Sequence, residues 1–413
     1  MAGSPGPDGG GPDLAALRRS LAEYVRTRGE VAGAAVAEAL RAVPRHLFLP
    51  GTPPEAAYRD EAIVTKRDAG GRPISSSSQP TIMGIMLDQL GVEPGARVLE
   101  IGAGTGYNAA LIAHLTGPGG EVVSVDIDQD VADAARDHLL DAGFPDVRVV
   151  CADGAEGFAE RAPYDRVIAT VGVWDLAPAW LDQLVPDGRI VVPLDLRGVQ
   201  CSVAMEREDD HWTSRSIRPC GFMRIRGTAA GPERTHVLDR ESELTLESPT
   251  GHDIDPQAVR ARLAATAIER NTGVVVGAAE IFGGLALWLA IREPSWCTLF
   301  GADACDLLGD TPLAVQGHKF TAGVLGDGGL ALLRRGPGPE AFELIVAGYG
   351  PAGDELAAGL VAQVRAWDAA GRPTAQGLRI DAYPISTRDG RLDAGTVIDK
   401  THTRLALSWP ALA

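Results

Sequence analysis

The chain has 413 residues, of which 45% are hydrophobic and 23% charged, and its formal net charge is -17. So acidic a surface disfavours a nucleic-acid partner, which is bound by clustered Lys and Arg, and no uncharged run approaches the roughly 20 residues of a membrane span. The five cysteines are scattered without metal-ligand spacing, so neither a metal site nor a disulfide framework is expected. We expect a cytoplasmic protein with roughly two or three domains. The acidic surface mainly favours solubility, although it also suits a basic peptide.

Residues 1–12 are rich in Gly and Pro and lack the basic start and apolar core of a signal peptide, so they are expected to be a flexible lead-in. Hydrophobic spacing then predicts, in chain order, an amphipathic helix from Asp13, a second helix over Val31 to Val43, a proline-bounded turn over Val43 to Pro50, and a strand-like piece over Ala57 to Val64.

Four consecutive serines follow in Ile74-Ser-Ser-Ser-Ser-Gln-Pro80, directly before a helical run over Ile82 to Leu90. Serine is a preferred N-cap residue, so the run is typical of a helix start. The hydroxyls are equally suited to point into a site. The residues alone favour capping and leave the second possibility open.

The most informative stretch is Val98-Leu-Glu-Ile-Gly-Ala-Gly-Thr-Gly-Tyr107, which a helical segment follows from Asn108 to Leu115. The order is strand, tight loop, helix. The three glycines allow a ligand to approach the backbone, and the helix start offers free N–H groups. Dinucleotide enzymes and other nucleoside-binding folds use similar loops, so the stretch alone does not identify the ligand.

Strands and helices alternate after this loop. The predicted elements are the strand Glu121 to Asp126, the helix Val131 to Ala142, the strand Val147 to Ala152 followed by Asp153 and Gly154, the strand Tyr164 to Thr170, the helix Pro178 to Leu184 and the strand Gly188 to Pro193. This order predicts an α/β fold with a doubly wound, Rossmann-like parallel sheet, whose ligand lies at the carboxyl ends of the strands.

A nicotinamide-binding loop usually has the spacing G-x-G-x-x-G, whereas here position 107 is Tyr. Glu100 before three alternate glycines, then an acid closing each of the next two strands, resembles the class I S-adenosyl-L-methionine-dependent methyltransferases. The resemblance implies this cofactor and the product S-adenosyl-L-homocysteine. It places Glu100, Gly102, Gly104 and Gly106 near the methionine part, Asp126 at the ribose, and Asp153 with Gly154 at the adenine.

Six ordered motifs narrow the resemblance to the protein-L-isoaspartate O-methyltransferases. They are Val43-Pro-Arg-His-Leu-Phe-Leu-Pro50, Tyr58-x-Asp60, Ile74-Ser-Ser-Ser-Ser-Gln-Pro80, the glycine stretch, Ala162-Pro-Tyr-Asp165 and Gly188-Arg-Ile-Val-Val-Pro193. In that family a serine before a small or polar residue and Pro lies between cofactor and substrate. Carried over, Ser78 is the catalytic residue, and Ser77, Ser78 and Tyr58 are expected to bind substrate. Ser75 to Ser77 are otherwise expected in a loop or cap.

The repair enzymes of this family are typically shorter and are expected to lack a counterpart of residues 226–413. The serine-rich motif and the extension resemble the family branch that accompanies ribosomally made, modified peptides, including lanthipeptide and graspetide pathways. That resemblance implies methylation of an aspartate in a constrained, macrocyclic precursor peptide, leading to a succinimide (aspartimide) or isoaspartate. Three alternatives remain open: a repair methyltransferase, a small-molecule carboxyl methyltransferase and a non-catalytic cofactor sensor.

The sequence therefore divides into a catalytic domain over residues 13–225, a polar connector over 226–255 and a second α/β domain over 256–413. The second domain carries no visible chemistry, so it is expected to hold the peptide, although a structural role or a dimer interface fits its residues equally well. Four tryptophans with apolar neighbours are expected in its core: Trp288, Trp296, Trp367 and Trp409. The oligomeric state cannot be predicted.

Overall fold

The computed structural model describes residues 12–28, 33–232, 234–249, 254–315, 317–392 and 395–410. The expected N-terminal lead-in and the start of the second predicted helix lie outside these ranges, apart from Pro12. The α-helices are α1 (Leu14–Arg28), α2 (Ala34–Ala42), α3 (Pro54–Ala57), α4 (Pro80–Leu90), α5 (Tyr107–Thr116), α6 (Gln129–Asp141), α7 (Pro178–Asp182), α8 (Pro256–Leu263), α9 (Ala278–Glu280), α10 (Ala286–Arg292) and α11 (Gly353–Ala369).

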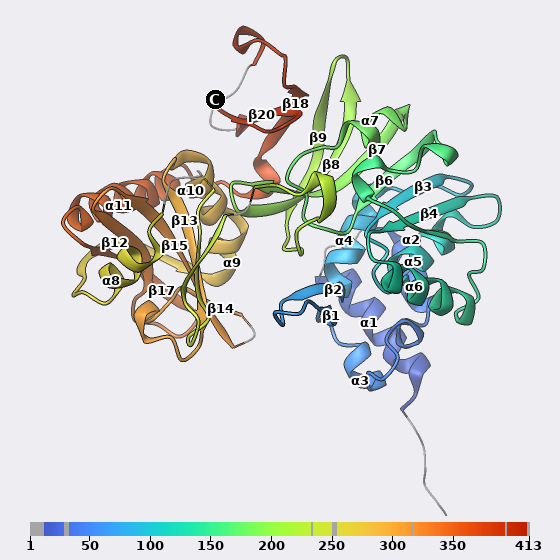
Figure 1. The fold of residues 1–413 in the computed structure, drawn as a ribbon, viewed down its shortest axis with the longest axis horizontal. Helices are drawn as coiled ribbons and strands as arrows, with labels where there is room; N and C mark the ends of the chain where they lie inside the picture. The colour runs from blue at the N-terminus through green and yellow to red at the C-terminus, as the bar shows by residue number, and fades with distance from the viewer. Residues whose placement is uncertain are drawn as a thin grey trace, which may run out of the picture.

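The strands form a short hairpin and two large sheets, which Figure 1 shows side by side. They are β1 (Ile63–Arg67), β2 (Pro73–Ser77), β3 (Arg97–Ile101), β4 (Glu121–Asp126), β5 (Arg148–Cys151), β6 (Tyr164–Ala169), β7 (Leu184–Leu196), β8 (Val199–Glu208), β9 (His211–Pro219), β10 (Thr235–Asp239), β11 (Leu244–Glu247), β12 (Ile268–Gly277), β13 (Trp296–Ala302), β14 (Leu313–Val315), β15 (His318–Gly326), β16 (Gly329–Arg335), β17 (Ala341–Tyr349), β18 (Arg379–Pro384), β19 (Thr396–Asp399) and β20 (Thr403–Ser408).

The first sheet confirms the predicted doubly wound architecture. Its strand order is β19-β20-β18-β9-β8-β7-β6-β3-β4-β5, and the strands from β7 to β5 are parallel. Strands β8 and β9, which the sequence pattern did not predict, extend the sheet in antiparallel pairing. Strands β4 and β5 lie on one side of β3, and β6 and β7 lie on the other. The strand order therefore reverses at β3, and a crevice forms there beyond the strand ends.

Strand β3 shows why the centre of this sheet forms. Its side chains alternate between two cores, because Val98 packs with α1, α2, α4, α5 and α6, whereas Leu99 packs on the opposite face with α7. Both residues are fully buried. An apolar run without alternating polar residues is typical of a parallel strand covered on both faces.

The second sheet is antiparallel, with the order β10-β11-β13-β15-β16-β17-β12, and β14 pairs with β15. Helix α11 covers one face and α8 contributes to the core on the other. Two strands of this sheet, β10 and β11, come from residues 226–255, so the expected connector is largely part of the second sheet. The four predicted core tryptophans are buried.

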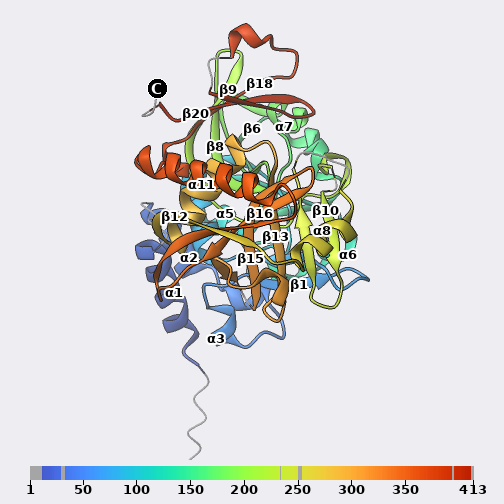
Figure 2. The ribbon, with the colours of Figure 1, turned by 90° about the vertical axis from the view of Figure 1, so that its left-hand side faces the viewer.

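The predicted boundary at residues 256–413 is wrong for the last three strands. Strand β18 pairs with β9, through Asp381 opposite Thr213 and Ala382 opposite Trp212, and β20 and β19 follow outward. Figure 2 shows β18 and β20 beside β9, above the second sheet. The chain thus leaves the first sheet after β9, builds the second sheet and returns.

A buried polar junction fixes the returning segment. The fully buried Lys400 Nζ donates to the Asp195 carbonyl at 2.8 Å and lies 3.3 Å from the centre of the Trp174 ring. Next to it, Thr403 Oγ1 donates to the Asp175 carboxylate at 2.6 Å. Because Trp174 and Asp175 follow the cavity-lining residues Thr170 and Val171, the C-terminal strands support the loop after β6.

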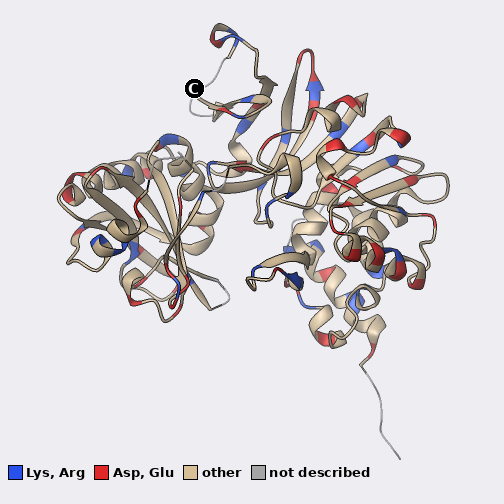
Figure 3. Cartoon of the chain, viewed as in Figure 1, with Lys and Arg blue, Asp and Glu red and all other residues tan. Residues whose placement is uncertain are grey.

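Acidic and basic residues are distributed over both sheets (Figure 3). Within the described ranges, no helix has the length and apolarity needed to cross a bilayer. The cytoplasmic location remains a prediction.

Burial lowers the pKa of Lys400 to about 7. An unfolded lysine keeps its proton up to about pH 10, so between these values the unfolded state binds more protons and the free energy of unfolding rises with pH. We expect Lys400→Met to be more stable than wild type at about pH 6.5, by about 1–3 kcal/mol, and to lose this advantage by about pH 9.5. Urea denaturation at the two pH values measures the difference. A difference independent of pH would contradict the assignment.

Candidate functional site

A cavity of about 650 Å³ lies at the carboxyl ends of β3, β4 and β6. Several parts of the chain form its walls: Asp60–Ala62, Ile74–Gln79 with Ile82 and Met83, the loop after β3 with the start of α5, the ends of β4 and β6, Gly154, Pro219–Arg226, and Phe282. The volume is in the usual range of a small-molecule site, and its position is the one a doubly wound sheet favours.

The glycine loop closes one side of the cavity with Gly102 and Gly104 among its lining residues. At Gly102, φ is +101°, and a Cβ would lie 2.8 Å from Thr170 Oγ1. At Gly104, φ is +52° and a Cβ would lie 3.4 Å from the Ser76 carbonyl oxygen. Gly106 does not line the cavity; it precedes α5, and a Cβ there would press on Ala135 and Leu139 of α6. The first two glycines therefore open the cavity, and the third allows helix packing.

Glu100 lies beneath the loop and does not line the cavity. Its fully buried carboxylate accepts hydrogen bonds from Asn108 Nδ2 at 2.8 Å and from Ser124 Oγ at 2.5 Å. Burial raises the pKa of Glu100 to about 7, against the lowering effect of these two hydrogen bonds. Glu100 thus connects β3, α5 and β4 below the ligand, and any cofactor contact of its side chain stays a prediction.

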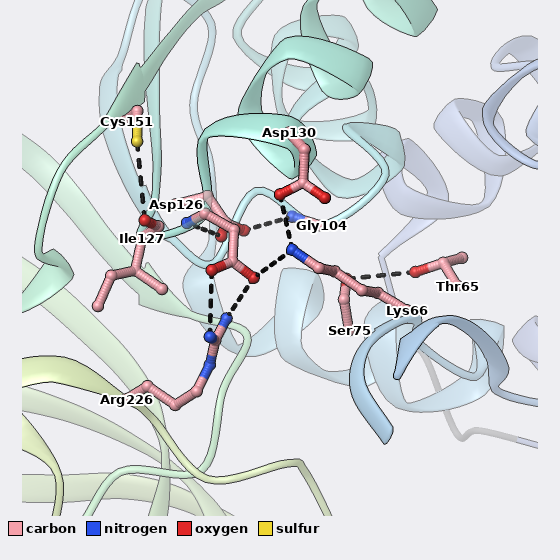
Figure 4. Close-up of polar contacts among 10 residues, drawn as sticks. Thr65, Lys66, Ser75, Gly104, Asp126, Ile127, Asp130, Cys151 and Arg226 are labelled. Carbon is pink, nitrogen blue, oxygen red and sulfur yellow. Dashed lines mark hydrogen bonds and ion pairs between the residues drawn. The ribbon is translucent and has the colours of Figure 1, made fainter. Parts of the chain in front are cut away.

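Asp126 lines the cavity at the end of β4 (Figure 4). Its carboxylate accepts from the Gly104 N–H at 3.0 Å and from the Asp128 N–H at 3.1 Å. Burial raises the pKa of Asp126, while these N–H donors lower it. An acid held at this place is suited to accept two ribose hydroxyls.

Asp128, missed in the sequence, joins two segments beside Asp126. Arg226 donates to both of its carboxylate oxygens, at 3.1 and 2.8 Å, and Lys66 Nζ contacts it at 3.0 Å. Lys66 also contacts Asp130 (Figure 4). The hairpin of β1 and β2 and the segment after β9 are thereby fastened to the end of β4.

Asp153 and Gly154 have different roles in the structure. Gly154 lines the cavity and Asp153 does not. The Asp153 carboxylate accepts from the Thr228 N–H at 2.8 Å, from Thr228 Oγ1 at 2.9 Å and from the Ala155 N–H at 3.0 Å. Its pKa is lowered, since these hydrogen bonds outweigh the opposing effect of burial. The Asp153 carboxylate thus holds the loop after Arg226, and its contact with adenine stays a prediction.

The serine segment also lines the cavity, and the Ser76 carbonyl oxygen lies close to Gly104. Ser75, Ser76 and Ser77 belong to β2, so the expectation that they lie in a loop or cap is wrong. The helix start of α4 is capped instead by Asp60, which accepts from the Thr81 N–H at 2.8 Å and from Thr81 Oγ1 at 2.9 Å. Ser77 and Ser78 both line the cavity, and the buried Ser77 Oγ has no hydrogen-bond partner.

Arg45 fixes Ser78 from behind. The Arg45 side chain is fully buried, and its guanidinium donates to the Ser78 carbonyl at 3.0 Å and to the Ala57 carbonyl at 2.9 Å. The same group lies 5.0 Å from the centre of the Tyr107 ring. Burial lowers its pKa below the ordinary arginine value. The proline-bounded turn thus connects the serine segment to the glycine loop.

Tyr58 does not line the cavity, and its contact with substrate stays a prediction. Its side chain is buried, and its hydroxyl forms a 2.8 Å hydrogen bond with His46 Nδ1.

The roles of Arg45 and Asp60 were not predicted. Both residues lie in the family motifs, but only the structure shows which groups they contact. Phe282, from the second sheet's part of the chain, lies outside these motifs.

These features fit S-adenosylmethionine. Gly102 and Gly104 leave room next to the backbone, and Asp126 offers a carboxylate for a ribose. The Ser77 hydroxyl, which has no hydrogen-bond partner, provides a polar group on the cavity wall. The described residues contain no group of three or more His, Cys, Asp or Glu side chains placed to hold a metal ion.

Comparison with known proteins agrees with this geometry. Residues 16–229 match the family model described as Protein-L-isoaspartate(D-aspartate) O-methyltransferase. A relative of that name from Methanopyrus kandleri is 37% identical over 212 residues, which cover 51% of this chain and 91% of the relative. Another from Thermotoga maritima is 34% identical over 222 residues, covering 53% of this chain and 68% of the relative.

A solved structure named protein-L-isoaspartate O-methyltransferase aligns over 88% of this chain and 96% of its own, with a TM-score of 0.50 and 22% identity. This likeness concerns the fold alone. It nevertheless extends beyond residue 229, so the expectation that such enzymes lack any counterpart of residues 226–413 is wrong. The length of the chain therefore does not by itself separate peptide maturation from repair.

The buried Glu100 leads to a testable pH dependence. With a pKa of about 7 in the folded chain and about 4.3 in the unfolded chain, Glu100 reduces stability as pH rises through this window. Glu100→Gln keeps an acceptor for Asn108 and gains a donor for Ser124. We expect its free energy of unfolding to exceed that of wild type by about 1–3 kcal/mol at about pH 8 and to equal it near pH 4. Urea denaturation at both values checks this, and a less stable variant at about pH 8 would refute it.

Proposed function

The chain belongs to the protein-L-isoaspartate(D-aspartate) O-methyltransferase family and is an S-adenosylmethionine-dependent carboxyl O-methyltransferase; from this premise we propose its acceptor. The proposed acceptor is the side-chain carboxylate of an aspartate in a ribosomally made, modified peptide. The observation that supports a carboxylate acceptor is that Ser77 and Ser78, which we call the serine wall, both line the cavity. A hydroxyl pair there suits an anionic carboxylate. The choice of a modified peptide rests on the resemblance of the serine-rich motif to the peptide-maturation branch.

S-adenosylmethionine supplies an electrophilic methyl group on a positively charged sulfur, and S-adenosylhomocysteine is the product. The chain's own residues need to hold the acceptor in line with that methyl. The acceptor carboxylate is ionised at neutral pH and attacks without a general base. Ser78 Oγ donates a hydrogen bond that orients it, and the Ser77 hydroxyl, which is buried without a partner, is a second donor.

The positions of these serines are set by hydrogen bonds with Arg45, which does not line the cavity, and with Asp60, which does. Arg45 holds the Ser78 carbonyl, and Asp60 holds the start of α4 directly after Gln79. Since hydrogen bonds fix the segment at both points, the serine hydroxyls need little reorganisation when the acceptor binds.

The fate of the ester depends on the peptide. In a suitable aspartyl segment, the nitrogen of the following backbone amide attacks the ester carbonyl, a C–N bond forms and methanol leaves, which gives a succinimide. Hydrolysis of the succinimide then gives isoaspartate or aspartate. A constrained peptide that holds this nitrogen near the ester favours ring closure.

Repair of isoaspartyl residues is the second candidate function. The relatives from Methanopyrus kandleri and Thermotoga maritima carry the name of that activity, and the alignment over 88% of the chain is with a structure of the same name. Both functions use a carboxylate acceptor at the same serine wall, so they differ only in which peptide carries that carboxylate.

Competing peptides separate the two functions. The enzyme is incubated with S-adenosylmethionine and either a linear isoaspartyl peptide or a macrocyclic aspartyl precursor peptide, and methyl ester and succinimide are followed by mass spectrometry. We expect a kcat/KM at least about tenfold higher for the macrocyclic aspartyl peptide, which corresponds to about 1.4 kcal/mol. Rapid methylation of diverse linear isoaspartyl peptides without preference for the macrocycle would favour repair.

The role of Ser78 is tested by Ser78→Ala, with Ser75→Ala as the matched control. Ser75 lies in the same segment, but its hydroxyl accepts a 3.2 Å hydrogen bond from Thr65 Oγ1. We expect Ser78→Ala to lower kcat/KM by at least about tenfold, because the donor that orients the acceptor is lost. The Kd for S-adenosylhomocysteine should stay within about twofold. Wild-type rates in Ser78→Ala would remove this residue from the mechanism.

A further inference from the structure

Phe282 reaches the catalytic cavity from outside the first sheet. It lines the same cavity as Ser77 and Ser78, although it follows α9 in the second part of the chain. Its side chain is 49% exposed, while Ile281 and Leu285 on either side are buried in the core shared by the two sheets. An exposed aromatic ring at a cavity, anchored by buried residues of the same turn, is available for binding.

The backbone around Phe282 is held firmly. Residues Ile281–Leu285 form a π-helical turn, a rare form that occurs frequently at functional sites. Gly284 packs so tightly that a Cβ would lie 2.5 Å from the Pro373 carbonyl oxygen. On the other side, Glu280 accepts from the Gly277 N–H at 2.9 Å and pairs with Arg372 at 2.5 Å. The ring is thus presented by a fixed turn.

The surroundings of Phe282 favour an apolar partner. Phe222 and Met223 line the cavity together with it. The arginines nearby are already neutralised, since Arg224 pairs with Glu247 and Arg226 with Asp128. They therefore provide little net attraction for an acidic segment.

The reacting groups do not require this ring. The predicted cofactor contacts are polar groups of β4 and the glycine loop, and the acceptor carboxylate requires the hydroxyls of Ser77 and Ser78. An apolar ring that lines the same cavity suits another side chain of the substrate.

We propose that Phe282 is a specificity-determining residue that binds an apolar side chain flanking the methylated carboxylate in the peptide. The inference rests on the proposed function, because it requires a peptide as the methyl acceptor. Through this contact the second part of the chain takes part in choosing the substrate, while the first part carries the transfer.

The experiment compares two peptides that differ only in the residue next to the acceptor, leucine in one and glycine in the other. Wild type, Phe282→Ala, Phe282→Leu and Phe300→Ala are measured with both. Phe300 is a matched control, because it is also an exposed phenylalanine of the second part and does not line the cavity. Thermal unfolding and the Kd for S-adenosylhomocysteine report folding and cofactor binding for each variant.

We expect Phe282→Ala to raise KM for the leucine peptide by about five- to thirtyfold, as the loss of a buried aromatic anchor does. KM for the glycine peptide, kcat and the S-adenosylhomocysteine Kd should stay within about twofold. Phe282→Leu should retain most of the leucine preference, and Phe300→Ala all of it. A leucine-to-glycine ratio in Phe282→Ala equal to that of wild type would overturn the proposal, as would an equal loss for both peptides.

The same set of proteins distinguishes the two proposals. If wild type methylates no carboxyl peptide, the proposed function fails, and the peptides are then compared by fluorescence anisotropy with S-adenosylhomocysteine present. A leucine preference in binding that disappears only in Phe282→Ala would still support the contact. Absence of such a preference would overturn it.

Discussion

The buried guanidinium of Arg45 is the contact on which the site depends. A charge removed from water is costly unless hydrogen bonds replace its hydration, and here the donors go to the carbonyls of Ala57 and Ser78 and to the sulfur of Met83. The face of Tyr107 completes the enclosure. The turn after α2, the serine segment and the first residue of α5 are therefore positioned together by this one side chain.

A second set of contacts fixes the other edge of the cavity. Asp128 receives Arg226 and Lys66, and Asp153 receives Thr228, so segments separated by about a hundred residues or fewer meet at the ends of β4 and β5. These bonds are partly exposed, so each contributes modestly to stability. Their main effect is geometric, since they place the segment after β9 across the strand ends.

The elements predicted correctly are those whose signal is local. Strand β4 spans Glu121–Asp126 as predicted, and α4, α5 and α6 differ from prediction by a few residues at their ends, because apolar periodicity and the glycines mark them. Gly102, Gly104 and Asp126 line the cavity as expected for a strand end and the loop after a strand. Ser77 and Ser78 also line it, but the residues alone favoured a helix cap, and only the family resemblance placed them at the site.

Side-chain partners could not be predicted from the sequence. Asp153 bonds to Thr228, 75 residues away, and Tyr58 to His46, 12 residues away, and neither Asp153 nor Tyr58 lines the cavity. The periodicity of the sequence indicates neither of these side-chain contacts. The contacts of the two residues with cofactor and substrate stay predictions. The pairing of β18 with β9 was also invisible, since a strand's sequence does not reveal which sheet it joins.

The return of β18, β19 and β20 makes the second sheet an insertion within the first. During synthesis, β9 is made long before the strand that covers its edge, and about 160 residues of the inserted part must emerge in between. Until then, the unpaired N–H and C=O groups of β9 are a place where another chain can pair. The loop after β6, which Lys400 and Thr403 support, is likewise completed last. The catalytic half thus acquires its final form only when the inserted part has folded and the last strands have docked.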